Sequence, residues 1–257
     1  MPHLICNDLN MYYEDTGSGE PIIFLHGSLT RGAPTFAAQI QAFQPSNRCI
    51  CPDLRGHGNT SCTDLCWTSE LLADDVIELM NALDLPKAHI VGHSMGADVA
   101  MYCAVNYPKR VSSIVSISSA GAVNDSVITY MERFNPESID MVKYGNLVET
   151  IQKEHFAAHG GNWQTLFNQS LANCYTYPDF TDDDFKKITA PFLLIYGSRD
   201  AMVKDYEVER LSQNISSFSC RLIEDCGHFP HVASQKCDVV NQMIMDFICQ
   251  CNSSTQM

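Results

Sequence analysis

The chain has 257 residues, of which 45% are hydrophobic and 18% charged, so it can bury a sizeable core and is not an intrinsically disordered protein. Its formal net charge of −14 argues against nucleic acid and anionic lipid as partners, because both are bound through clustered lysine and arginine. No apolar run approaches the ~20 residues of a membrane span, so none is expected.

The twelve cysteines are many for this length, but their spacing does not indicate a metal site. Cys49 and Cys51 are separated by one residue, as are Cys249 and Cys251, and no pair forms the C-x-x-C knuckles of structural zinc. Residues 1–4 lack the charged and apolar segments of a secretory signal, so we expect a cytoplasmic protein with reduced thiols. The sequence does not indicate an oligomeric state.

Short apolar runs recur along the chain and predict the strands. An N-terminal hairpin is expected first, with turns at residues 7–10 and 17–19. Runs that are apolar on both faces then follow, which is typical of buried strands in a parallel sheet. These runs are residues 22–25, 49–51, 89–91, 114–117, 192–196 and 221–223.

Amphipathic stretches lie between these runs and predict helices. Helical spacing of apolar residues is found at 71–83, 95–107, 203–214 and 237–250. Strands that alternate with helices favour a parallel sheet with right-handed crossovers. The predicted fold class is therefore α/β, with a doubly wound, mostly parallel sheet.

Residues 122–188 interrupt this alternation, because they contain helical patches and many aromatic residues but no convincing strand. We expect a core domain from residues 1–121 and 189–257, with 122–188 inserted as a helical cap over the carboxyl ends of the strands, where such sheets bind ligands. Aromatic residues and methionines of the cap, Trp163 among them, indicate an apolar or aromatic acyl or alcohol group. Most of them can equally build the core of the cap itself.

The segment Gly92-His93-Ser94-Met95-Gly96 follows a predicted strand and opens a predicted helix. This is a G-x-S-x-G pattern in the context that the motif requires, with a serine on a sharp, strained turn and glycines where side chains would clash. The helix N-terminus directs free N–H groups towards the site. Ser94 is therefore the predicted nucleophile.

A serine hydroxyl needs a base and an acid that orients the base. In sheets of this kind the acid and then the base follow the nucleophile along the chain. Asp200 follows the strand at 192–196 and His228 follows the strand at 221–223, so they are the predicted acid and base. His231 remains an alternative base, and two other carboxyls remain alternative acids, Asp205 and Asp225.

An oxyanion formed at the attacked carbonyl needs two N–H donors, each worth roughly 3–4 kcal/mol. The N–H of Met95 is one candidate, and the loop after residue 25 supplies the second, with Ser28 first and Leu29 as the alternative. His26 can tie this loop down. Arg31, beside the loop, is a candidate contact for an acidic substrate or else a solvated residue.

The blocks 26–28, 53–60, 92–96, 197–200 and 227–230, which read His-Gly-Ser, Asp-Leu-Arg-Gly-His-Gly-Asn-Thr, Gly-His-Ser-Met-Gly, Gly-Ser-Arg-Asp and Gly-His-Phe-Pro, resemble the α/β-hydrolase superfamily. The resemblance covers about residues 12 to 247 and is closest to a serine-esterase-like branch with a helical cap. It implies a structural role for the block 53–60, because this block is usually structural in such proteins. Asp98 departs from the family pattern, which often has an apolar or small residue there, and a carboxylate at this position needs a partner.

The resemblance implies hydrolysis of a small-molecule carboxylic ester or related acyl substrate through an acyl-enzyme, with neither metal nor organic cofactor. Amide, thioester, lactone and carbon–carbon bonds remain open, because fold-level analogy does not select a substrate. Two further alternatives are a receptor that keeps the hydrolase fold and a binding scaffold without activity. The filled Ser94, Asp200 and His228 positions disfavour the scaffold.

Overall fold

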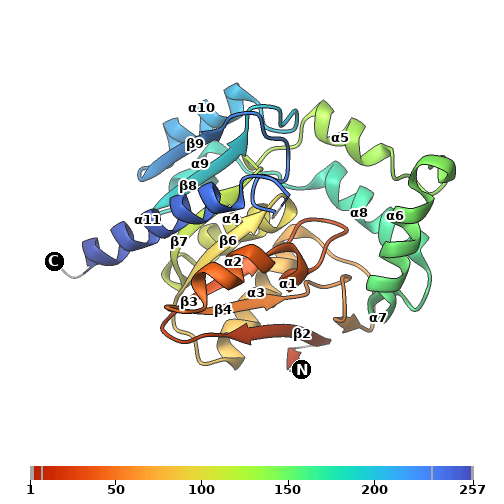
Figure 1. Cartoon of the computed structure of the whole chain (residues 1–257), viewed down its shortest axis with the longest axis horizontal. Helices are drawn as coiled ribbons and strands as arrows, with labels where there is room; N and C mark the ends of the chain where they lie inside the picture. Colours follow the sequence, from red (N-terminus) through yellow and green to blue (C-terminus); the bar gives the residue numbers. More distant parts are fainter. Residues whose placement is uncertain (1–2, 7, 233, 256–257) are drawn as a thin grey trace.

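The structure, a computed structural model, describes residues 3–6, 8–232 and 234–255, with side chains up to residue 253. Figure 1 shows its strands and helices. The elements in chain order are β1 (His3–Cys6), β2 (Leu9–Thr16), β3 (Glu20–Leu25), α1 (Gly32–Thr35), α2 (Ala37–Phe43), β4 (Asn47–Pro52), β5 (Ser61–Cys62), α3 (Ser69–Ala82), β6 (Ala88–His93), α4 (Met95–Asn106), a 3-10 turn (Pro108–Arg110), β7 (Val111–Ile117), α5 (Asp125–Glu132), α6 (Met141–Glu154), α7 (Phe156–His159), α8 (Trp163–Thr176), α9 (Asp182–Lys187), β8 (Phe192–Gly197), α10 (Asp205–Asn214), β9 (Phe218–Ile223) and α11 (Cys237–Thr255).

The described residues form a nine-stranded sheet in the order β1-β2-β4-β3-β6-β7-β8-β9, with β5 paired to β2. The strands from β4 to β9 along this order pair in parallel, whereas β1, β2 and β5 pair antiparallel. The doubly wound, mostly parallel sheet is thus confirmed. Each of the six predicted apolar runs lies inside a parallel strand, and the first five are buried by helices on both sides of the sheet, apart from the partly exposed Tyr196. The sixth run, 221–223, lies in the edge strand β9, where Arg221 and Leu222 are exposed.

The N-terminal hairpin is present as β1 and β2, but its turn is shorter than predicted. Leu9 and Asn10 already belong to β2, where they pair with Cys6 and Ile5, and Asn7 lies outside the described residues. The turn at 17–19 leads from β2 into β3, yet these strands are not neighbours, since β4 lies between them.

Two layers of helices cover the sheet. One apolar cluster joins one face of the strands to α1, α2 and α11, through side chains that include Phe36, Phe43 and Ile244. A larger cluster joins the other face to α3, α4, α9 and α10. The short helices α1 and α2 were not predicted, and α11 continues to Thr255, beyond its predicted end at residue 250.

The chain between β7 and β8 contains five helices and, among the described residues, no strand. Figure 1 shows α5, α6, α7 and α8 together, beside the sheet rather than over either of its faces. α9 instead packs against α4 and α10 on the sheet. The four helices α5 to α8 are called the inserted helices below.

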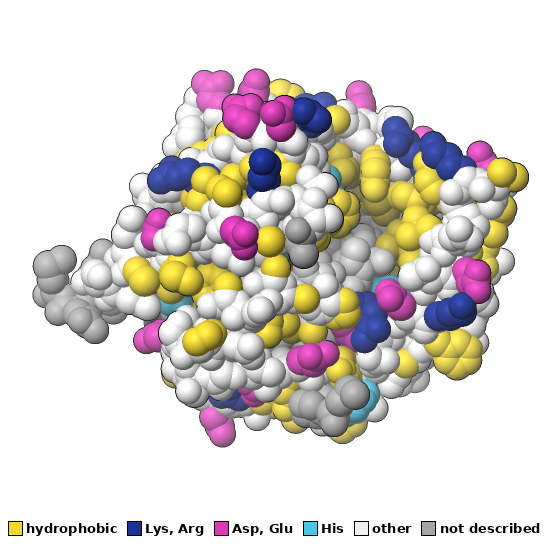
Figure 2. Space-filling view, viewed as in Figure 1, with side chains coloured by type: hydrophobic (Ala, Val, Ile, Leu, Met, Phe, Trp, Pro, Cys, Tyr) yellow, Lys and Arg dark blue, Asp and Glu magenta, His cyan; other side chains and the backbone are white. Residues whose placement is uncertain are grey.

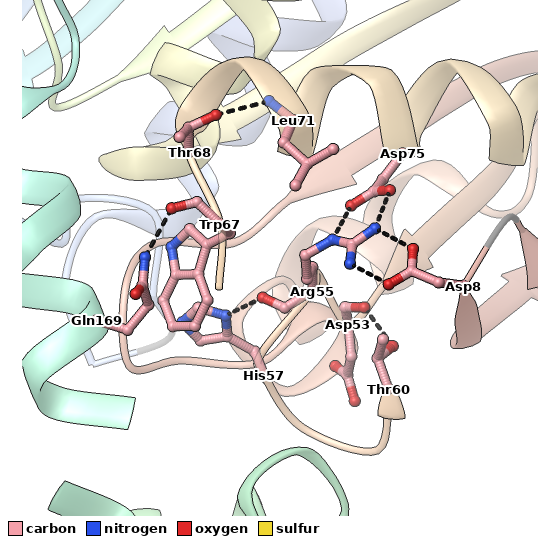
Figure 3. A network of polar contacts seen from close by, with 10 residues as sticks. All are labelled: Asp8, Asp53, Arg55, His57, Thr60, Trp67, Thr68, Leu71, Asp75 and Gln169. Atoms are coloured by element: carbon pink, nitrogen blue, oxygen red, sulfur yellow. Dashed lines mark hydrogen bonds and ion pairs between the residues drawn. The ribbon is translucent and has the colours of Figure 1, made fainter. Parts of the chain in front are cut away.

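A buried arginine fastens the loop after β4 to two other parts of the chain (Figure 3). The Arg55 guanidinium donates to both carboxylate oxygens of Asp75 on α3, at 2.8 and 2.9 Å. It also donates to both oxygens of Asp8, between β1 and β2, at 2.8 Å each. His57 in turn donates from Nδ1 to the Arg55 carbonyl oxygen. The loop that follows β4 is therefore tied both to α3 and to the connection between β1 and β2.

The loss of stability on removing one partner of Arg55 should depend on how deeply that partner is buried. Asp75 is 1% exposed and Asp8 is 45% exposed in the side chain. Asp75→Ala leaves a buried guanidinium short of a counter-charge, so the free energy of unfolding should fall by roughly 3–5 kcal/mol. Asp8→Ala removes a solvent-screened partner and should cost about 1 kcal/mol or less. Urea unfolding of both variants measures this, and equal costs would contradict the assignment.

Candidate active site

Ser94 lies at the sharp turn between β6 and α4. Its φ of 51° and ψ of −122° place it among the positive-φ residues that are not glycine, where an L side chain is strained. A Cβ on Gly92 would lie 2.2 Å from the Gly96 carbonyl oxygen, and a Cβ on Gly96 would lie 2.1 Å from the Leu25 carbonyl oxygen. Both glycines are therefore required by close backbone packing around the serine.

His228 and Asp200 meet, although 28 residues separate them. His228 Nδ1 lies 3.0 Å from Asp200 Oδ2, and because a carboxylate only accepts, Nδ1 carries the proton. The second oxygen of Asp200 accepts from the Met202 N–H at 3.0 Å. The Asp200 side chain is fully buried, and that of His228 is 13% exposed. Nε2 of His228 is thereby left as the basic nitrogen.

The loops after β8 and β9 are hydrogen-bonded to each other, which explains this meeting. The Arg199 N–H donates to the Cys226 carbonyl oxygen at 2.8 Å, and the Asp225 N–H donates to Ser198 Oγ at 3.0 Å. Because β8 and β9 are neighbouring parallel strands, their two loops leave the sheet at the same edge. Asp200 and His228 are thus held on two loops that are hydrogen-bonded to each other.

His93, beside Ser94, holds the backbone at His228. Its Nε2 lies 2.9 Å from the His228 carbonyl oxygen, and its ring packs against His228, Phe229 and His231. Burial lowers the pKa of His93 well below its usual value, so the ring stays neutral and donates from Nε2. A structural role for this turn residue could be expected from the sequence, but its partner could not.

The alternative acids and base lie elsewhere. His231 is fully buried against Phe36 and His93, and neither of its ring nitrogens has a hydrogen-bond partner among the described residues. Asp225 is exposed and paired with Arg199. Asp205 is the first residue of α10. The acid that contacts His228 is therefore Asp200.

The loop after β3 is held by two neutral histidines. His26 accepts at Nε2 from the Leu54 N–H (2.9 Å), and its Nδ1 lies 2.8 Å from the Gly27 carbonyl oxygen. His57 accepts at Nε2 from the Leu29 N–H (3.3 Å). Burial lowers the pKa of His26 to about 4 and that of His57 to about 3. With the Leu29 N–H engaged, Ser28 is the candidate donor with no acceptor among the described residues.

The side chain of Arg31 supports this loop from behind. Arg31 Nε lies 3.6 Å from Asp53 Oδ2, and Asp53, itself 1% exposed, accepts from the Gly32 and Asn59 N–H groups at 2.9 Å each. The block from Asp53 to Thr60, part of which Figure 3 shows, therefore packs beneath the loop as a scaffold.

A cavity of about 190 Å³ opens at Ser94. Of the predicted site residues, it is lined by Ser94, His228, Met95, Ser28 and Leu29. Neither Arg31 nor Trp163 lines it: Arg31 faces Asp53, and Trp163 packs edge-on against Phe167 in the inserted helices. In Figure 2 hydrophobic side chains gather around a hollow beside these helices.

The inserted helices contribute an apolar wall to the cavity. This wall comes from α5, α6 and the segment between them, and its members are Val127, Tyr130, Met131, Phe134, Leu147 and Ile151. A second, more open cavity of about 430 Å³ shares Tyr130, Met202 and His228 with the first and also contacts Asp200. His228 therefore lies where the two cavities meet.

Asp98 also lines the first cavity, one helical turn after Ser94. The partner that the sequence did not reveal is Ser119, whose hydroxyl donates to Asp98 Oδ1 at 2.5 Å. Burial raises the pKa of the Asp98 carboxyl to about 7; the hydrogen bond from Ser119 opposes the rise and the charge of Glu207 adds to it.

The described residues contain neither a metal-binding cluster nor a membrane-spanning helix. Across residues 3–6, 8–232 and 234–255, no group of three or more histidine, cysteine, aspartate or glutamate side chains could hold a metal ion. Within the same ranges no helix is both long and apolar enough to cross a bilayer. No disulfide is found in the part of the chain that the structure describes.

The raised pKa of Asp98 predicts a pH-dependent stability. Between its ordinary value of 3.8 and about 7, the folded protein keeps a proton that the unfolded chain has lost. The free energy of unfolding therefore falls as pH rises through this interval, by ~1.4 kcal/mol per unit from this group, and levels off above it. Asp98→Asn should gain ~2 kcal/mol over the wild type between pH 5 and pH 7. Urea unfolding at both pH values checks this, and a pH-independent difference would refute it.

Comparison with known proteins identifies the family of the chain. The model of the alpha/beta hydrolase family matches residues 22–242. A protein of Mycobacterium tuberculosis, provisionally described as the non-heme bromoperoxidase BpoC, is 34% identical over 93% of this chain and 97% of its own length. The 2-hydroxy-6-oxononadienedioate/2-hydroxy-6-oxononatrienedioate hydrolase 1 of Pseudomonas putida is 26% identical over 94% of this chain and 92% of its own length.

Solved structures share the fold. The meta-cleavage product hydrolase CumD of Pseudomonas fluorescens IP01 matches with a TM-score of 0.80 at 22% identity, over 97% of this chain and 98% of its own. An esterase of Thermogutta terrifontis matches with a TM-score of 0.74 at 25% identity, over 95% of this chain and 94% of its own. The family match spans Ser94 and the loops that carry Asp200 and His228. It shows that the chain belongs to the alpha/beta hydrolase family.

Proposed function

We propose that the protein is a serine hydrolase that cleaves a carboxylic ester through an acyl-enzyme, with Ser94 as nucleophile, His228 as base and Asp200 as the acid. The observation that carries this proposal is the 3.0 Å contact between His228 Nδ1 and Asp200 Oδ2, with His228 and Ser94 lining one cavity. A buried carboxylate that fixes the proton on Nδ1 leaves Nε2 free to take the serine proton.

Attack begins when Ser94 Oγ gives its proton to His228 Nε2 and bonds to the acyl carbon. The imidazolium that forms is stabilised by the ionised Asp200, which needs no proton of its own. The carbonyl oxygen becomes an oxyanion, and the N–H groups of Met95 and Ser28 are the proposed donors to it. Neither N–H has an acceptor among the described residues, and both residues line the cavity.

The tetrahedral intermediate then collapses. His228 returns its proton to the leaving alkoxide, the alcohol departs and the acyl group stays on Ser94 Oγ. Water, deprotonated by the same nitrogen, attacks the acyl carbon, and the carboxylic acid is released. The cycle consumes one water and needs no external electron donor or acceptor.

We further propose that residues 122–188 act as a cap that selects the substrate. The apolar side chains that α5 and α6 turn into the cavity favour an apolar or aromatic acyl or alcohol group. The esterase of Thermogutta terrifontis, with its 25% identity, supports the choice of an ester. The Pseudomonas putida relative, named for a hydroxy-oxo-dioate substrate, makes a keto acid the second candidate.

Replacing the nucleophile should abolish turnover. Ser94→Ala removes the atom that forms the acyl-enzyme, so kcat should fall on the order of 10⁶-fold with p-nitrophenyl esters as substrates. Ser212→Ala, at an exposed serine on α10, is the matched control and should keep full activity. Wild-type rates in Ser94→Ala would refute the nucleophile assignment. A fluorophosphonate probe should label the wild type and Ser212→Ala but not Ser94→Ala.

A substrate panel separates the remaining alternatives. It consists of p-nitrophenyl esters of rising chain length, tested beside amide, thioester, lactone and keto-acid substrates. We expect multiple turnovers and the highest kcat/KM on esters, because the cavity combines an activated hydroxyl with an apolar wall. A single slow turnover would favour a ligand receptor, and a keto-acid preference would favour the second candidate.

A further inference from the structure

The cavity at Ser94 has a polar side as well as the apolar wall of α5 and α6. Asp98 and Ser119 contribute from the core, and Ser170, Asn173 and Cys174 contribute from α8. All but Ser119 are at least nine-tenths buried. The mechanism proposed above uses none of these groups, so their place in the cavity needs another explanation.

One side chain from the loop after β7 holds the Asp98 carboxyl. Ser119 Oγ donates to Asp98 Oδ1, 2.5 Å away, and accepts from the Gly121 N–H at 3.2 Å. Among the described residues, no other side chain donates to the Asp98 carboxyl. A buried carboxyl with a single donor is short of hydrogen bonds, and its second oxygen is the unused acceptor.

α8 carries a buried hydroxyl that also lacks a hydrogen-bond partner. Ser170 is 3% exposed, and its Oγ has no hydrogen-bond partner among the described residues. Cys174, one turn further along α8, is close enough to Asp98 that the carboxylate charge adds to the effect of burial, which together raise the pKa of the thiol to about 11. Asn173 is held by Ser69 of α3, which fixes this part of α8 against the core. Ser170 and Asp98 therefore line the same cavity, one from α8 and one from α4.

We propose that Asp98 and Ser170 form a specificity subsite that binds a hydroxyl group on the substrate, about one helical turn from the carbonyl carbon that Ser94 attacks. The inference rests on the proposed ester hydrolysis and names its substrate class, a hydroxyacyl ester. A hydroxyl fits because it donates one hydrogen bond, to Asp98, and accepts another, from Ser170. An ether oxygen has no proton to donate to Asp98.

The distance along α4 from Ser94 to Asp98 determines the length of the test substrate. Four residues along α4 correspond to ~6 Å, which a six-carbon acyl chain covers. The probes are the p-nitrophenyl esters of 6-hydroxyhexanoate, 6-methoxyhexanoate and hexanoate at pH 8. The wild type should prefer the hydroxy ester over the methoxy ester by about tenfold in kcat/KM, the effect of one hydrogen bond to a charged acceptor.

Asp98→Asn should abolish this preference. The amide replaces the carboxylate oxygen that accepts from the substrate hydroxyl, and an NH₂ group turned to the cavity donates equally to a hydroxyl or to a methoxy oxygen. The hydroxy and methoxy esters should then differ less than threefold in kcat/KM. Ser170→Ala should reduce the preference without abolishing it. Ser212→Ala, at an exposed serine of α10 outside the cavity, is the control and should keep the wild-type rates on all three esters. Hexanoate, which has no polar group at this position, measures how much of each change is unrelated to the hydroxyl.

The outcomes separate the two proposals. If the wild type turns over all three esters with no hydroxyl preference, or Asp98→Asn leaves the preference unchanged, the subsite is refuted and the hydrolase stands. If no ester is turned over, the hydrolase proposal falls. The subsite is then decided by calorimetric titration of Ser94→Ala with the same esters, where the hydroxy ester should bind about tenfold more tightly and equal dissociation constants would overturn it.

Discussion

The first turn of α4 lies so close to the end of β3 that a methyl group on Gly96 would sit 2.1 Å from the carbonyl oxygen of Leu25. This approach is possible only because Gly96 has no side chain, and it brings the start of the nucleophile helix beside the loop that begins at His26. Met95 and Ser28 consequently line one cavity. The positive φ of Ser94 follows from the same contact, since the chain must reverse within a single residue.

Buried neutral histidines maintain this arrangement. His26, His57 and His93 are each at most 1% exposed, and burial lowers the pKa of each, so they contribute fixed donors and acceptors rather than charge. Each joins parts of the chain that are distant in sequence: His26 contacts Leu54, His57 contacts Leu29, and His93 contacts the His228 carbonyl oxygen. The imidazole assigned to proton transfer is instead partly open to the cavity.

The sequence was sufficient for the sheet, because strands buried on both faces and amphipathic helices leave periodic signals. It was also sufficient to bring Asp200 and His228 together, since loops after neighbouring parallel strands leave the same edge of the sheet. Their catalytic role stays a prediction. The short helices α1 and α2 were missed, because four to seven residues are too few for a clear period.

Contacts between distant side chains were less accessible from the sequence. Arg31 and Trp163 were chosen for their chemistry and position along the chain, yet one pairs with Asp53 and the other packs on Phe167. The partnership of Asp98 with Ser119 joins α4 to the loop after β7 and leaves no local pattern. Such pairings depend on side-chain direction in three dimensions, which a linear pattern does not carry.

The stretch between β7 and β8 supplies the apolar wall and Ser170, whereas Ser94, Asp200 and His228 lie on either side of that stretch in the chain. Much of the cavity wall and the proposed reacting groups are thus encoded in separate segments of the gene, although Asp98 of α4, which also lines the cavity, lies in the same segment as Ser94. Substitutions in the inserted helices can reshape the wall without touching the contact between His228 and Asp200.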